Sequence, residues 1–154
     1  MYTPTTQQLG ISSVKAPAEF IPADIPVVWQ ELSALLYPAV ELSQGMLSLE
    51  QIEVWLRSGQ ATAFAVIEKQ QLKMAVIAMP VEYAFYNAAR IVALAGEDLK
   101  ESWKFLPVLE AWALTRNCVE IEGWCREEIW RMLRPLGWTK KTNILSWDLR
   151  RKLQ

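Results

Sequence analysis

The segment that most constrains the fold runs from Cys118 to Trp138. Apolar and acidic residues alternate in it as far as Gly123, and apolar residues then recur at three- and four-residue spacing up to a Pro-Leu-Gly sequence. This order predicts a strand, a glycine turn, a helix over Arg126–Arg134 and a final strand over Trp138–Leu149. Strands that alternate with helices favour an α/β or α+β architecture.

The elements expected before this segment are two helices, three strands and one helix. Asp24 caps the first helix, which Pro38 is expected to break, and Ser48 caps the second, which ends at Gly59. The strands are expected at residues 61–68, 72–79 and 90–95, and the helix at residues 101–117. The sequence therefore predicts a mixed central sheet of about five strands flanked by about four helices.

The length of 154 residues suits one domain with its own core. Residues 1–23 hold prolines among polar residues, which predicts an extended N-terminal arm before a single domain over residues 24–154. No apolar run approaches the ~18 residues of a membrane span, and the first residues lack the pattern of a secretory signal. We therefore expect no membrane span and a cytoplasmic location.

The composition excludes several kinds of chemistry. The chain has no histidine, so no imidazole can serve as a general base or as a zinc ligand. Its two cysteines, Cys118 and Cys125, are too few for a disulfide framework, and both are expected to be buried. Any catalysis must use carboxylates, tyrosine or bound water.

Charge is divided unevenly along the chain. Residues 1–122 hold eight Lys and Arg against fourteen Asp and Glu, a net charge of −6, whereas residues 123–154 hold eight against three, a net charge of +5. An uneven distribution of charge of this kind is typical of solvated helix faces. It also suits head-to-tail contact between copies of the chain or docking on an acidic partner such as a nucleic acid.

The element order over roughly residues 25–150 resembles the GCN5-related N-acetyltransferase fold. Four short sequence segments also resemble those of a group of bacteriophage proteins with this fold, including internal virion proteins of short-tailed phages. These segments are Ala95-Gly96-Glu97-Asp98-Leu99, Leu109-Glu110-Ala111-Trp112-Ala113, Gly123-Trp124 and Leu136-Gly137-Trp138.

Two departures from that family argue against catalysis. The resemblance implies an Arg/Gln-x-x-Gly-x-Gly/Ala loop whose amides bind the coenzyme A diphosphate, but residues 96–103 hold one glycine and three carboxylates. At near contact each carboxylate repels a phosphate by about 1 to 4 kcal/mol, so this loop is expected to reject coenzyme A. The resemblance also implies a tyrosine on the helix after the fifth strand, where this chain has Trp124, Cys125 and Trp130.

The favoured hypothesis is therefore a non-catalytic phage virion or morphogenesis protein without a cofactor. It acts through contacts with other virion proteins or with copies of itself, in the cytoplasm of a bacterial host and, if the phage resemblance holds, in the virion. The residues expected to make these contacts are Phe20, Ile21, Ile25, Arg126, Arg131, Arg150, Arg151 and Lys152.

Two alternatives stay open. The first is an N-acetyltransferase that uses acetyl-CoA, with Gly96, Lys100 and Ser102 at the cofactor and Glu82 or Glu120 as the base that relays the amine proton. The second is a nucleic-acid-binding accessory protein with salt-dependent affinity. Its basic residues would be Arg126, Arg131, Lys140, Lys141, Arg150 and Arg151.

Overall fold

The computed structural model describes residues 16–142 and 144–150. The chain divides into two compact units, the N-terminal unit Met1–Trp124 and the C-terminal unit Cys125–Gln154. The N-terminal unit holds β1 (Ala18–Phe20), η1 (Pro22–Asp24), α2 (Ile25–Leu42), α3 (Leu49–Ser58), β2 (Thr62–Glu68), β3 (Gln71–Glu82), β4 (Asn87–Gly96), η2 (Leu99–Phe105), α4 (Leu106–Thr115) and β5 (Cys118–Gly123). The C-terminal unit holds α5 (Glu127–Leu133) and η3 (Arg134–Leu136). No described helix combines the length and the apolarity needed to cross a membrane.

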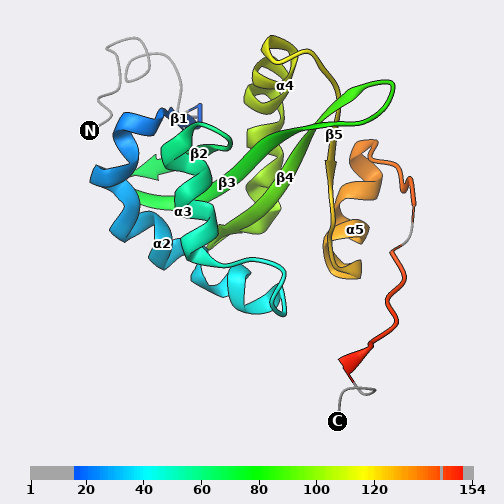
Figure 1. Cartoon of the computed structure of the whole chain (residues 1–154). Helices are drawn as coiled ribbons and strands as arrows, with labels where there is room; N and C mark the ends of the chain where they lie inside the picture. The colour runs from blue at the N-terminus through cyan, green and yellow to red at the C-terminus, as the bar shows by residue number, and fades with distance from the viewer. Residues whose placement is uncertain (1–15, 143, 151–154) are drawn as a thin grey trace. The chain divides into compact units, whose positions relative to one another are not determined.

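The N-terminal unit is built around a five-stranded sheet in the order β1-β2-β3-β4-β5. Its neighbouring strands are antiparallel except β4 and β5, which are parallel. Helices α2 and α3 cover one face of the sheet and α4 covers the other, as Figure 1 shows. The predicted class, a mixed sheet of about five strands with about four helices, is confirmed.

Both faces of the sheet carry a hydrophobic core, as the uniformly apolar sequence of β2 predicts. Ala63 and Ala65 pack beneath α2 and α3, while Phe64 packs beneath α4. The Phe64 ring meets the ring of Trp112 edge to face, with centroids 5.7 Å apart. A strand covered on both faces needs apolar side chains in both directions, which explains why β2 shows no polar alternation.

The second helix begins and ends where the sequence predicts, but the first does not break at Pro38. Ser48 Oγ accepts the backbone N–H of Gln51 at 3.1 Å, and Gly59 ends α3 with a φ of +81°. Helix α2 runs through Pro38 as far as Leu42. Pro38 is exposed and the residues after it pack on the core, so burial of the helix face offsets the lost backbone hydrogen bond.

The described end of the predicted N-terminal arm is a packed strand instead. Ala18 and Phe20 of β1 pair with Ala65 and Ala63 of β2, and both β1 side chains are buried. Ile25 at the start of α2 is fully buried as well. The prolines argue against a helix and predict an extended arm, but an extended segment with alternating apolar residues is also what an edge strand requires.

The predicted final strand over Trp138–Leu149 is also wrong. Residues 138–142 and 144–149 form no strand, and β1 takes the fifth place in the sheet. An alternating sequence pattern specifies which side chains share a face but does not supply the neighbouring strand that a sheet needs.

The helix expected over residues 101–117 starts as a 3₁₀ helix, η2, and becomes α-helical at Leu106. Pro107 lies in the first turn of α4, where its missing N–H costs nothing and its ring prevents α-helical continuation toward the N-terminus. The chain therefore leaves β4 through a short acidic loop and η2 before it reaches α4.

Candidate functional site

The candidate site lies where the parallel strands β4 and β5 part. Their pairing runs from Asn87 opposite Cys118 to Ile91 opposite Gly123. Strand β4 continues to Gly96, and its register against β3 shifts so that Val92 forms a bulge at the parting. Within the described part of the N-terminal unit, no strand follows β4 on the β5 side beyond Ile91. Backbone N–H and C=O groups on that side are a template for an extended ligand.

Three polar side chains meet at the parting. Tyr83, from the end of the β3–β4 hairpin, has its hydroxyl 2.7 Å from each carboxylate oxygen of Glu122 on β5. Arg90 on β4 donates from Nε to Glu122 at 3.1 Å and from Nη2 to the Tyr83 hydroxyl at 3.1 Å. Because a hydroxyl has one proton, Tyr83 donates to Glu122 and accepts from Arg90.

This network determines the protonation of its members. The hydrogen bond to Glu122, followed by burial, raises the pKa of Tyr83 above its ordinary value. Burial opposes the charge of Arg90, but the hydrogen bonds to Tyr83 and Glu122 outweigh burial and raise its pKa. Near neutral pH, Tyr83 therefore keeps its proton and Arg90 its charge. The Arg90 guanidinium also lies 5.2 Å from the ring centroid of Trp124.

The two glutamates predicted as bases lie on opposite faces of the sheet. Glu120 pairs in register with Ala88 and is half-buried, two residues before Glu122 and on the same face. Glu82 is exposed and lies on the α4 face of the sheet. It is three residues beyond Met79, which packs on the α2 and α3 face, and residues an odd number apart in a strand point to opposite faces. Glu120 shares the site with Tyr83 and Glu122, and Glu82 does not.

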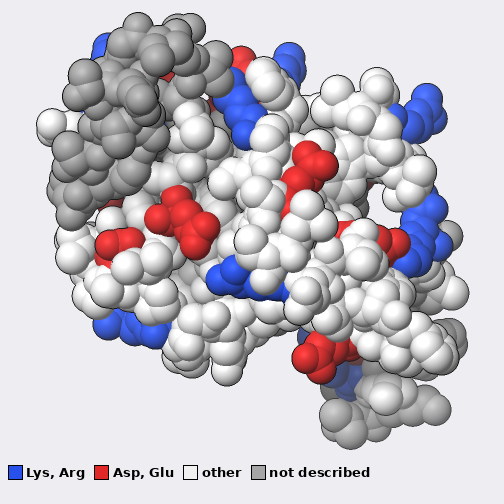
Figure 2. Space-filling model, turned by 90° about the horizontal axis from the view of Figure 1, so that it is seen from above, with Lys and Arg blue, Asp and Glu red and all other residues white. Residues whose placement is uncertain are grey.

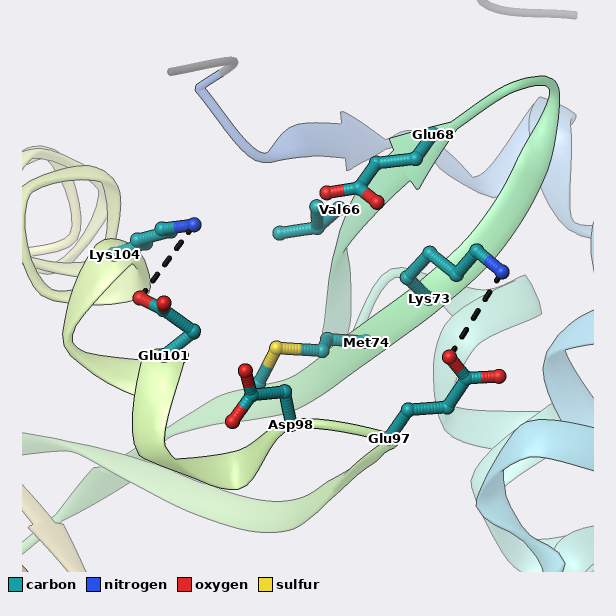
Figure 3. Close-up of a pocket in the computed structure, with 8 residues that line it drawn as sticks. All are labelled: Val66, Glu68, Lys73, Met74, Glu97, Asp98, Glu101 and Lys104. Atoms are coloured by element: carbon teal, nitrogen blue, oxygen red, sulfur yellow. Dashed lines mark ion pairs between the residues drawn. The ribbon is translucent and has the colours of Figure 1, made fainter. Parts of the chain in front are cut away.

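The acidic loop after β4 repels a phosphate group less strongly than its sequence suggests. Lys73 Nζ lies 3.8 Å from a carboxylate oxygen of Glu97, and Lys104 Nζ lies 3.5 Å from one of Glu101 (Figure 3). The indole N–H of Trp103 donates to Glu101 at 3.1 Å. Two of the three carboxylates therefore have a lysine partner, which reduces the field that a diphosphate would meet.

The remaining residues predicted at the cofactor have separate roles. Gly96 has a φ of +147°, and a Cβ there would lie 2.5 Å from the Lys73 carbonyl oxygen, so the glycine lets β3 and β4 approach each other. Lys100 is exposed at the start of η2, whereas Ser102 is half-buried. Of these three residues, Lys100 is the one with a charge available to a phosphate.

A pocket of about 190 Å³ lies between η2 and the ends of β2 and β3. Val66 and Met74 form its apolar part, and Glu68 points into it from β2 (Figure 3). Its charged lining residues are Glu68, Lys73, Glu97, Asp98, Glu101 and Lys104. Four carboxylates against two lysines make the pocket unsuitable for a diphosphate. No group of side chains that could hold a metal ion occurs in the part of the chain that the structure describes.

The predicted contact residues are divided between core and surface. Phe20 and Ile25 are buried in the core of the N-terminal unit, so the expectation that they contact a partner is wrong, whereas Ile21 is exposed. Arg126, Arg131 and Arg150 are exposed. The other two predicted contacts, Arg151 and Lys152, lie outside the described residues.

Three described basic side chains of the C-terminal unit lie close to carboxylates of the same unit. Arg131 lies 3.9 Å from Glu127, Lys140 lies 3.8 Å from the same carboxylate, and Arg150 lies 3.0 Å from Asp148. On the face that Figure 2 shows, basic side chains are scattered among acidic and uncharged ones. This distribution does not favour the nucleic-acid alternative.

The two cysteines differ. Cys118 is buried in the core beneath α4, as expected, and burial raises the pKa of its thiol. Cys125 is exposed, so the expectation of a second buried cysteine is wrong. Partial desolvation and then the charge of Glu127 raise the pKa of Cys125, which disfavours its thiolate form.

Sequence comparisons give no relative, because no protein-family model and no curated protein matches the chain. Solved structures do match. A predicted acetyltransferase from Clostridium acetobutylicum with acetyl-CoA is similar at a TM-score of 0.64 and 12% identity, covering 88% of this chain and 96% of the other. The aminoglycoside N-acetyltransferase AAC(6')-Iy in complex with CoA is similar at a TM-score of 0.64 and 10% identity, covering 86% and 97%.

A third similar structure is an aminoglycoside acetyltransferase from an uncultured soil metagenomic sample in complex with sisomicin. Its TM-score is 0.63 and its identity 12%, and the match covers 86% of this chain and 93% of the other. Identities this low establish the fold alone. The chain has a GCN5-related N-acetyltransferase-like fold, as the element order predicts, while the resemblance to bacteriophage proteins gains no support.

Proposed function

We propose that the protein is an N-acetyltransferase that uses acetyl-CoA. The observation that carries the proposal is the parting of β4 and β5 after Ile91 and Gly123, with the Tyr83–Glu122–Arg90 network beside it. The acetyl-CoA and CoA in two of the similar structures support it. This function replaces the non-catalytic role that the acidic loop favours at the level of sequence.

The residues present fit the cofactor in two ways. Coenzyme A has an extended arm with amide groups, and the backbone of β4 from Val92 to Gly96 continues past β5 to meet such an arm. The lysine partners of Glu97 and Glu101 lower the repulsion near η2, where Lys100 is exposed. When bound, acetyl-CoA would supply the activated acetyl group.

The side chains at the parting then handle the protons. Glu120, on the same face as Tyr83, takes the proton that the amine nitrogen loses as the new amide bond forms. Tyr83, whose raised pKa keeps its hydroxyl protonated, would give that proton to the sulfur that the acetyl group leaves, in place of its hydrogen bond to Glu122. Glu122 and Arg90 are positioning residues that hold the Tyr83 hydroxyl in place. In this role Tyr83 would replace the tyrosine that the family resemblance implies on the helix after β5, where this chain has Trp124, Cys125 and Trp130.

A thiol-release assay with acetyl-CoA and a panel of amines tests the proposal. Tyr83→Phe is expected to lower kcat by about a hundredfold, the usual loss when a general acid is removed. Tyr37→Phe is the matched control, since Tyr37 is also exposed, also bonds a carboxylate, that of Glu41, and lies on α2. Thiol release at the background rate with every amine would contradict the proposal.

A second candidate is a catalytically silent protein that keeps the fold and acts by contact. Asp98, which has no ion-pair partner among the described residues, and the acidic pocket beside it favour this candidate. It predicts no acetyl-CoA binding by calorimetry and no effect of Tyr83→Phe on any measured property except stability. No comparison supports a role in a bacteriophage particle.

A further inference from the structure

The tip of the β3–β4 hairpin carries aromatic side chains where a turn usually carries small or polar ones. Residues 83–86 read Tyr-Ala-Phe-Tyr. The rings of Tyr83 and Tyr86 pack together, with their centroids 5.1 Å apart. Phe85 is 99% exposed, so no part of the N-terminal unit covers its ring. Turn positions favour Gly, Asn, Asp or Pro, and a fully exposed phenylalanine in their place indicates a function that the fold itself does not require.

The backbone holds this tip in a defined position. Strands β3 and β4 pair as far as Glu82 opposite Asn87. Beyond this pair, the Tyr83 N–H donates to the carbonyl oxygen of Tyr86 at 2.8 Å, which leaves Ala84 and Phe85 to make the turn. The rings are therefore in place before any ligand arrives, and a preorganised surface loses little conformational freedom on binding.

The rings border the side chains that handle protons in the proposed function. The Tyr83 hydroxyl donates to Glu122 at 2.7 Å, and Arg90 donates to that hydroxyl at 3.1 Å. The Arg90 guanidinium lies 5.2 Å from the ring centroid of Trp124, which is 58% exposed and is the last residue of the N-terminal unit. We name four residues of the N-terminal unit the aromatic rim: Tyr83, Phe85, Tyr86 and Trp124. An acceptor whose nitrogen approaches this network has aromatic surface within reach of its remaining atoms.

The charges beside the aromatic rim suit an acceptor with a single positive charge. Arg90 Nε lies 3.1 Å from a carboxylate oxygen of Glu122, so this pair brings no net charge to the site. Glu120, the proposed base, is the one carboxylate of β5 on this face outside that pair. A polycation gains most from several carboxylates in excess, whereas ring faces attract one ammonium group and stack against an aromatic group. The site therefore offers one negative charge and a large aromatic surface.

We propose that the aromatic rim selects the acceptor and that the acceptor is an aryl-alkyl amine, a compound with one amine group and one aromatic ring. The ring of the acceptor packs against Phe85, and its nitrogen faces Glu120. Phe85 determines specificity, because it contacts the substrate ring without touching the reacting atoms. This inference rests on the proposed function, to which it adds the substrate class, and it changes none of the proton transfers described there.

Thiol release by the full chain with acetyl-CoA and three amines tests the substrate class. Phenethylamine carries the aromatic ring, cyclohexylethylamine has the same charge and a similar shape without an aromatic face, and spermidine has more charge and no ring. We expect kcat/KM for phenethylamine to exceed that for cyclohexylethylamine by about threefold to tenfold, the usual gain of an aromatic pair over apolar burial alone. It should exceed that for spermidine by a larger factor, since spermidine leaves the aromatic rim without a partner.

A variant of the exposed ring locates the contact. Phe85→Ala should raise the KM for phenethylamine by about tenfold, because the substrate ring loses its aromatic partner. Tyr37→Ala is the matched control, since it removes an exposed ring from α2 and should leave that KM unchanged.

The outcomes separate this inference from the proposed function. An unchanged KM in Phe85→Ala would overturn the inference, and so would thiol release as efficient with spermidine or cyclohexylethylamine as with phenethylamine. The proposed function would stand in each of these cases, because thiol release would still occur. Release at the background rate with every amine would contradict the proposed function itself and this inference with it.

Discussion

The two units of this chain contain similar kinds of residue but differ in what they bury. Every buried apolar side chain in the described residues belongs to the N-terminal unit, and none belongs to the C-terminal unit. Both units have apolar residues at helical or strand spacing, so periodicity alone does not produce a core. A core needs a second layer to pack against, which the sheet gives α2, α3 and α4.

The largest difference between the units should appear when one aromatic residue is truncated in each. Phe64 is fully buried against Trp112, so Phe64→Ala should lower the free energy of unfolding by about 3 to 5 kcal/mol. Trp147 is 83% exposed, so Trp147→Ala should change it by less than about 0.5 kcal/mol. Urea unfolding measures both. Equal losses would show that the C-terminal unit has a core of its own.

Replacing one glycine in each unit by alanine should have an intermediate effect on the free energy of unfolding. Gly96→Ala places a Cβ 2.5 Å from the Lys73 carbonyl oxygen and 2.8 Å from Met74 Cα, at a φ of +147°, so strain and displacement of β3 should cost about 3 kcal/mol or more. Gly137→Ala meets no atom within 4 Å and carries only the strain of a φ of +101°, so it should cost about 1 kcal/mol. Thermal unfolding of the two variants provides the comparison. A Gly96→Ala protein as stable as the Gly137→Ala protein would contradict the close approach of β3 and β4.

The smallest effect should come from the helix caps. Ser48→Ala removes the side-chain acceptor for the Gln51 N–H and should destabilise the protein by about 1 kcal/mol. Arg126 occupies the cap position of α5 with an extended backbone and no side-chain cap bond, so Arg126→Asp should stabilise α5 by about 0.5 kcal/mol. Urea unfolding followed by circular dichroism measures both. Destabilisation by Arg126→Asp would mean that Arg126 makes a contact more valuable than a cap.

The parts of the fold that the sequence predicts well are local. The cap at Ser48, the stop at Gly59 and the buried strand β2 depend on residues a few positions apart. The errors concern partners far away in the sequence. Pro38 is tolerated because α2 packs on the sheet, and β1 forms because β2 lies beside it. The intrinsic helix and strand propensities of the residues do not predict such contacts.

The candidate site shows the same limit. Strand alternation places Glu120 and Glu122 on one face, and this much follows from sequence. The meeting of Tyr83, Arg90 and Glu122 depends on the register of β4 against β5, which the sequence does not state. The sequence does not predict the Lys73 partner of the acidic loop for the same reason, since Lys73 comes from β3 and is distant in sequence from Glu97.

The central claim is that the parting of β4 and β5 holds acetyl-CoA, and calorimetric titration of acetyl-CoA into the full chain tests it most directly. We predict saturable binding of one equivalent per chain with micromolar affinity, weakened in Lys100→Glu by repulsion of the diphosphate and unchanged in Tyr37→Phe. Absence of saturable binding in the unmodified chain, at protein and ligand concentrations well above the micromolar range, would contradict the claim.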